Sequence, residues 1–185
     1  MSAILQASMQ MGLSSEASTR LRPEMTAQAA VQSLLDAGAA QDALKLLARL
    51  LPKRYAVAWL CQCARDQPLE LEDKAGASLA EKWVREPTES NRRAAYEFAN
   101  SGGYKSLGAW LAAAAGWSGG SLAPSAQETP VPPPEQLTAC ATVAAINLMA
   151  ALVAEHFAAR RAEFVARALN LLGTGEAAGA GGKGA

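Results

Sequence analysis

The sequence predicts an all-α fold: a single compact bundle of six to eight helices, with a long strap rich in proline and glycine before the last helical region. Half of the 185 residues are apolar but only 5% are aromatic, so the core must consist mainly of alanine and leucine, two strong helix formers. Apolar residues recur at helical spacing, whereas no run alternates between apolar and polar residues as a half-buried strand does. The length suits one domain with a core of its own.

Composition divides the chain into three parts. Residues 1–22 are mixed and end near the linker-like SSEAST, which predicts a loose N-terminal segment. The alternative is a short helix that places Ile4, Leu5, Met9 and Leu13 on the core. Residues 23–172 form the predicted helical domain, and the Gly/Ala-rich residues 173–185 are expected to be a disordered tail.

Six helices are expected between Thr26 and Trp117, because capping residues and prolines divide this stretch. They cover residues 27–37, 41–51, 53–65, 70–85, 89–101 and 106–117, with N-caps predicted at Thr26 and Thr88. Successive helix pairs do not share residues at matching positions, so a repeat solenoid is not favoured. The tryptophans lie on or beside apolar stripes, and we expect all four to be mostly buried: Trp59, Trp83, Trp110 and Trp117.

The strap, residues 118–134, has no apolar periodicity. Its adjacent Gly119 and Gly120 permit the turn that leaves the sixth helix, and its prolines from 130 to 134 predict polyproline II. We expect residues 123–134 to run extended over the helices, held at the ends by Leu122 and Val131. The last helical region, residues 135–172, is about 55 Å long if it forms one continuous helix; the alternative is a break near residues 155–160, at the polar cluster EHFAARRAE.

The sequence offers little for catalysis or metal binding. His156 is the one histidine, and Glu155 beside it lies on another face of the helix, so a nucleophile–histidine system is not supported. Cys61 and Cys63 are about 200° apart on a helix, so they cannot chelate one ion and are interpreted as buried thiols. We therefore expect no enzyme activity, no cofactor and no metal site. A ligand-binding helical protein remains a third class, which would need a pocket.

Charge and hydropathy also limit location and partners. The formal net charge is zero, which argues against nucleic-acid binding through phosphate contacts. The three cysteines, an odd number in a chain long enough to fold without disulfides, favour the reducing cytoplasm. The apolar run 137–153 is shorter than the roughly 20 residues of a membrane span and contains Thr138, Thr142 and Asn147. We expect it to be a core helix, with no membrane span.

Two basic pairs stand where positive charge is unfavourable. Lys53–Arg54 and Arg92–Arg93 fall in the first turn or two of predicted helices, where cations oppose the helix dipole. Residues that oppose a local preference can mark a functional site. The alternative is solvated charge, or an internal ion pair with Glu86 or Glu89.

The segments LPKRYAVAWLCQCARD, AEKWVREPTESNRRAAYEFA, WLAAAAGWSGGSLAP and VPPP resemble a family of bacterial helical proteins encoded beside type VI secretion spike, PAAR and effector genes. The resemblance covers about residues 27–150. Tyr55 departs from the pattern, which has an acidic residue after the basic pair, and the end of the chain matches poorly. The family has no established catalytic residues, and at least one relative resembles a co-chaperone or adaptor for a secreted toxin.

The resemblance implies a non-enzymatic cytoplasmic adaptor or co-chaperone that binds a type VI secretion effector, its PAAR-type spike protein, or both, and assists loading. The alternative is a structural or regulatory domain of the secretion apparatus without effector contact. The residues expected to bind the partner or to carry the motif are Lys53, Arg54, Trp59, Trp83, Arg92, Arg93, Trp117, Ser118, Gly119, Gly120, Ser121, Pro132 and Pro133.

Overall fold

The structure, a computed structural model, describes residues 1–180 and confirms the all-helical fold class: this range contains ten α-helices and no strand. Eight of the ten α-helices begin within the predicted helical domain. The helices are α1 (Ala3–Gln10), α2 (Ser15–Arg20), α3 (Ala27–Asp36), α4 (Ala40–Leu50), α5 (Lys53–Arg65), α6 (Leu71–Arg85), α7 (Glu89–Ser101), α8 (Leu107–Gly116), α9 (Leu137–Ala151), the 3-10 turn η1 (Ala154–His156) and α10 (Phe157–Ala180).

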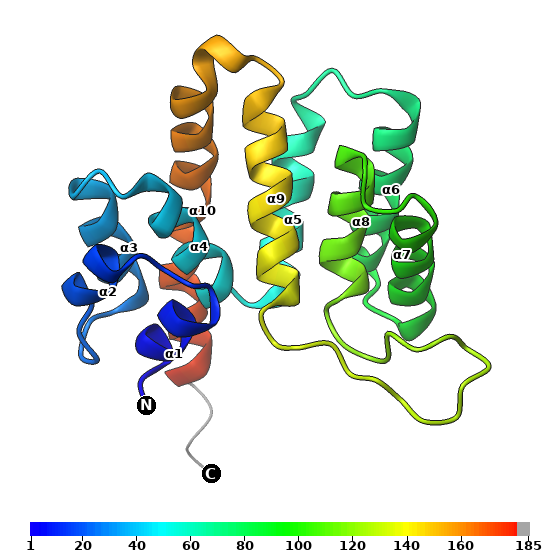
Figure 1. Ribbon diagram of the computed structural model, residues 1–185, viewed down its shortest axis with the longest axis horizontal. Coiled ribbons are helices and arrows are strands. Elements are labelled where there is room, and N and C mark those ends of the chain that lie inside the picture. Colours follow the sequence, from blue (N-terminus) through cyan, green and yellow to red (C-terminus); the bar gives the residue numbers. More distant parts are fainter. Residues whose placement is uncertain (181–185) are drawn as a thin grey trace.

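The helices form two adjoining groups that meet at α9 and α5 (Figure 1). In one group α8 packs against α6, α7 and α9, and every residue of α8 except Trp110 is buried. In the other group α4 lies between α3, α9 and α10. The strap lies at the end of the bundle where α5 and α7 begin and α8 ends, and the α9–α10 turn lies at the opposite end.

Glycines allow α6 and α8 to approach backbone to backbone. A Cβ added at Gly76 would lie 2.0 Å from the carbonyl oxygen of Gly108, and one added at Gly108 would lie 2.6 Å from the Cα of Asp73. The Asp73 carboxylate accepts a 2.7 Å hydrogen bond from the Gly108 amide, one of the amides that α8 leaves unpaired at its first turn. Small residues in both helices therefore set the spacing around α8.

The predicted capping residues begin their helices. The side-chain oxygens of Thr26 and Thr88 accept hydrogen bonds from the amides of Ala29 and Asn91, which confirms both N-caps. Ser106 caps α8 in the same way. The starts of α3, α5, α7 and α8 therefore follow the sequence closely, because each is set by a local capping side chain or by Pro52.

The N-terminal segment is not loose, so the preferred prediction for residues 1–22 is wrong. Ser2 and Ser14 each cap a helix, and α1 packs on α4. Ile4, Ala7 and Ala17 are buried in the main core. Two short helices survive here because both have a side-chain cap and bury one apolar face.

The last helical region is divided, which decides between the two alternatives, and α9 ends at Ala151, before residues 155–160. The axes of α9 and α10 bend by 115° across the turn. The α10 helix continues to Ala180, so residues 173–180 are helical where a disordered tail was predicted. The rest of that tail, 181–185, lies outside the described residues.

Within the described residues, no single helix is long and apolar enough to cross a membrane. The bent pair of Leu137–Ala151 and Ala154–Gly173 passes the same test only when both helices are counted together. Most of α9 is core, because its buried residues include Ala141, Ala145 and Met149.

Candidate functional site: the strap and its anchor on α7

The strap turns back on itself soon after α8 ends. Gly120 takes a φ of +63°, a backbone conformation that glycine adopts readily. The Leu122 amide then donates a 2.8 Å hydrogen bond to the Val131 carbonyl. The hydroxyl oxygen of Ser121 accepts from the amides of Ala123 at 3.1 Å and Val131 at 2.9 Å. These bonds close residues 122–131 into a loop.

The loop corrects the prediction of an extended run held separately at Leu122 and Val131. The two residues pair with each other, and Val131 is exposed instead of being an apolar anchor. The buried contact of the strap is Ala123. Backbone bonding between residues nine apart holds the base of the loop together, so the segment between them projects from the bundle end (Figure 1).

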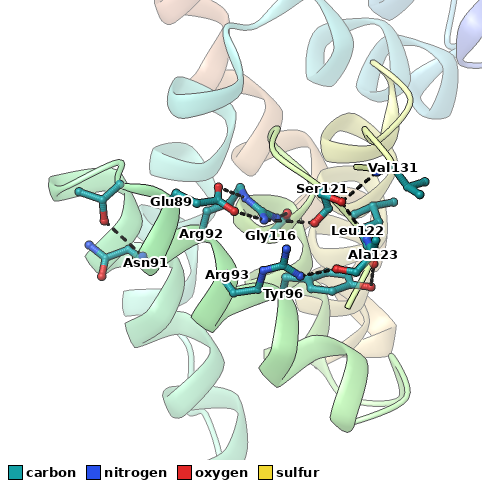
Figure 2. A network of polar contacts seen from close by, with 11 residues as sticks. Glu89, Asn91, Arg92, Arg93, Tyr96, Gly116, Ser121, Leu122, Ala123 and Val131 are labelled. Atoms are coloured by element: carbon teal, nitrogen blue, oxygen red, sulfur yellow. Dashed lines mark hydrogen bonds and ion pairs between the residues drawn. The ribbon is translucent and has the colours of Figure 1, made fainter. Parts of the chain in front are cut away.

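Three side chains of α7 hold three successive carbonyl groups of the strap (Figure 2). Arg92 donates to the Ser121 carbonyl at 3.2 Å, Tyr96 to the Leu122 carbonyl at 2.7 Å, and Arg93 to the Ala123 carbonyl at 2.8 Å. We call these three side chains the α7 anchor. They fix the backbone of the strap where it leaves α8.

Arg92 is the most constrained member of the anchor. Its side chain is 3% exposed, and it donates to the Glu89 carboxylate from both Nε and Nη2, at 2.7 and 2.6 Å. Its Nη1 donates a 2.6 Å bond to the carbonyl of Gly116, at the end of α8. The hydrogen bonds from Arg92 hold the pKa of Glu89 below its ordinary value of 4.5. The internal ion pair with Glu89 is therefore present.

Glycine is required where the strap passes Arg92. A Cβ at Gly120 would lie 2.6 Å from Nε of Arg92 and 2.7 Å from Oε2 of Glu89. Gly119 differs, because a Cβ added there would meet nothing within 4 Å and its φ is not positive. Of the two predicted glycines, Gly120 is the one that the anchor geometry constrains.

Lys53 joins the two ends of the strap. Its Nζ donates a 3.0 Å hydrogen bond to the Ser118 carbonyl and lies 3.6 Å from the carboxylate of Glu135. Ser118 follows α8 directly, and Glu135 precedes α9. The Lys53 side chain at the start of α5 therefore binds both the entrance and the exit of the strap.

Both basic pairs lie beside the carboxyl ends of neighbouring helices. Arg54 donates to the carbonyls of Val84 at 2.8 Å and Arg85 at 3.4 Å, at the end of α6. Arg92 does the same at the end of α8. The negative end of a neighbouring helix dipole thus compensates a cation that is poorly placed in its own helix. Arg54 is part of this pattern but not of the strap site.

The tryptophans separate into core and surface-facing residues. Trp59 and Trp83 are buried, and the Trp59 indole donates a 2.8 Å bond to the Phe164 carbonyl, so neither is available to a partner. Trp110 and Trp117 are half-buried and pack with Tyr104, whose ring centroid lies 5.2 Å from that of Trp117. Tyr104 is the one non-glycine residue of the described range with a positive φ, at 57°.

The projecting part of the strap is accessible. Residues 124–132 are all exposed, Pro132 among them, while Pro133 is half-buried. The structure thus brings Lys53, Arg92, Arg93 and the segment from Trp117 to Ser121 together at one end of the bundle. Sequence reasoning missed Tyr96, although it lies four residues after Arg92 and therefore on the same helix face.

Outside the strap site, the described residues include few groups suited to catalysis or metal binding. Burial raises the pKa of both Cys61 and Cys63 to about 12, as expected for buried thiols, whereas Cys140 is exposed. No group of three His, Cys, Asp or Glu side chains among them is placed to hold a metal ion. An open groove of about 330 Å³ between α5 and α6, lined in part by Cys61, Lys74 and Glu81, lies apart from the strap.

Fold and site together define a single-domain helical protein with a fastened, projecting loop. A sequence model described as a family of unknown function, DUF6931, matches residues 7–172, so the chain belongs to the DUF6931 family. The match covers the second half of α1, all of α2 to α9, and α10 as far as Leu172. Neither curated proteins nor solved structures gave a significant match.

Proposed function

We propose that this protein is a non-enzymatic adaptor or co-chaperone that binds a type VI secretion effector, its PAAR-type spike protein, or both, through the strap. The secretion context comes from the sequence resemblance alone. The observation that supports binding by the strap is the α7 anchor: Arg92, Tyr96 and Arg93 hold three successive carbonyls, while the nine residues that follow are exposed.

A fastened base lowers the entropy that a loop loses on binding, because its ends are already fixed before the partner arrives. The prolines of the strap restrict the unbound segment further. Such a loop suits recognition of a protein surface, and it requires no catalytic group. Under this proposal the protein acts in the cytoplasm before secretion.

The test is recovery of the effector and PAAR proteins encoded beside the gene, from cells that express the tagged full-length protein. The strap variant replaces Pro130, Pro132, Pro133 and Pro134 with Gly and Ser, and the control is Leu71→Glu at an exposed site on α6. We expect the strap variant to lose most of the recovered effector or PAAR protein while its melting temperature changes little.

Two outcomes count against the proposal. Unchanged recovery by the strap variant would remove the strap from the binding surface and leave it a connector. Recovery of secretion-apparatus components, with neither the effector nor the PAAR protein, would favour the alternative structural or regulatory role.

A further inference from the structure

A second accessible apolar surface lies at the α9–α10 turn, at the end of the bundle opposite the strap (Figure 1). Among the described residues, eight large apolar side chains are exposed, and three of them fall within six residues here: Leu148 at 40%, Leu152 at 48% and Val153 at 37%. Single exposed apolar residues need no explanation, but a cluster of them indicates an interaction surface.

The cluster continues a row along α9. Cys140, Ala144, Leu148 and Leu152 follow one another at intervals of four residues; Ala144 is half-buried and the other three are exposed. Side chains four apart form a ridge on a helix, about 18 Å long over this stretch, and such ridges pack into the groove of a second helix. The shape of the surface therefore suits a helix.

Near the start of α9, the chain itself packs apolar side chains against another face of that helix. Met11 packs between Ala48 of α4 and Ala139 of α9, with Leu13 and Val143 against them. Toward the end of α9, Leu148 and Leu152 remain exposed.

Two arginines of α10 lie beside α9 without an acidic partner among the described residues. Arg161 donates a 2.9 Å hydrogen bond to Gln41, which also accepts from Asn147 at 3.3 Å. Arg160 donates to Gln67 and to the Met149 carbonyl. Neither arginine forms an ion pair with a carboxylate of the described residues, and the buried Nε atoms of both lack a hydrogen-bond partner there.

We propose that the row Ala144, Leu148 and Leu152, with Val153, binds an amphipathic helix of a partner protein that carries a carboxylate beside its apolar face. The partner's apolar ridge packs on the leucines, and its carboxylate lies beside Arg161. A membrane surface fits less well, because exposed Glu155 lies at the tip of the turn and the row runs along α9 instead of ending there.

This inference rests on the proposed role in protein binding, but it concerns a separate surface. The probe is a synthetic amphipathic helix of about 18 residues with leucines on one face and glutamates beside them; a matched peptide carries lysines in place of the glutamates. Binding of each to the full-length protein is measured by fluorescence anisotropy. Vesicles of phosphatidylcholine, with and without phosphatidylglycerol, are tested by co-sedimentation.

We expect the acidic peptide to bind about tenfold more tightly than the basic one, and Arg161→Gln to remove that preference. Leu148→Glu with Leu152→Glu should weaken binding about tenfold or more, while Leu71→Glu, at a leucine on α6 that is more exposed than either, should not. Circular dichroism establishes that the variants fold. The strap variant should bind the peptide normally.

Equal binding of the two peptides, or unchanged binding after the two leucine substitutions, would overturn the inference. So would vesicle binding that the same substitutions abolish. A further outcome is that the leucine variants fail to bind the peptide and still recover as much effector as the parent protein. In that case the surface on α9 does not bind the effector, and the strap proposal stands.

Discussion

Replacing Arg92 with methionine tests whether the α7 anchor holds the strap. Methionine keeps an apolar stem but removes the guanidinium, and with it the donors to the Gly116 and Ser121 carbonyls. A buried acceptor that loses its donor costs about 1–3 kcal/mol, with the lower value for Ser121, whose bond is only partly buried. Glu89 is largely exposed, so water can replace its partner.

The sum predicts a loss of about 2–4 kcal/mol in the free energy of unfolding for Arg92→Met. The matched control is Arg93→Met, which removes one partly buried bond to the Ala123 carbonyl and should cost less than about 1 kcal/mol. Urea unfolding, followed by circular dichroism, gives both values if the slope of the transition is unchanged.

A second measurement reports on the strap itself. Glutamyl endopeptidase can cleave after Glu128, the one acidic residue among residues 118–134. The cleavage rate should rise in Arg92→Met, because the loop base has lost its fastening to α7 and α8. A stability change below about 1 kcal/mol, or equal changes for the two arginines, would refute the assignment of Arg92 as the main anchor.

Three further substitutions, with Gly119→Ala as a control, test the glycine turn, the α6–α8 contact and the ion pair of Glu89 with Arg92. Gly120→Ala should lower the free energy of unfolding by about 1–3 kcal/mol, because the added Cβ meets Arg92 and the φ of Gly120 is positive. Gly119→Ala should change the free energy of unfolding by less than about 0.5 kcal/mol. Equal effects of the two substitutions would contradict this reasoning. Gly76→Ala should destabilise by at least about 3 kcal/mol, measured by urea unfolding, because α6 and α8 must separate. The pKa of Glu89 in the folded protein is below its ordinary value of 4.5, so the ionised carboxylate stabilises the fold above pH 4.5. This stabilisation is lost as the pH falls through the folded pKa. The stability difference between the parent protein and Glu89→Gln should therefore close in acid, and a difference independent of pH would refute the ion-pair assignment.

Local signals account for most of what the sequence predicted correctly. Thr26 and Thr88 were recognisable because a cap, a proline and an apolar stripe fall together within a few residues. The N-terminal helices carry the same capping signal at Ser2 and Ser14, but each is so short that its stability depends on packing against the rest of the bundle. That packing is not visible in a short stretch of sequence.

The strap shows where sequence reasoning fails for a different reason. Its glycine turn was predictable, because two adjacent glycines have few other uses. Its path was not, because it depends on where α7 places Arg93 and Tyr96 and on the bond between Leu122 and Val131. Those are contacts between elements, and no periodicity within residues 118–134 encodes them.

The basic pairs combine a signal that the sequence carries with contacts that it does not carry. Their conflict with the dipoles of α5 and α7 was visible in the sequence and did mark a special position. Its resolution was not visible, because the compensating carbonyls belong to the ends of α6 and α8 and to the strap. Lys53, Arg54, Arg92 and Arg93 therefore fasten neighbouring segments instead of presenting free charge. A partner that binds this end of the bundle would meet the loop that three of these four side chains hold in place, and the contribution of those side chains to binding would be indirect, through the position of the loop.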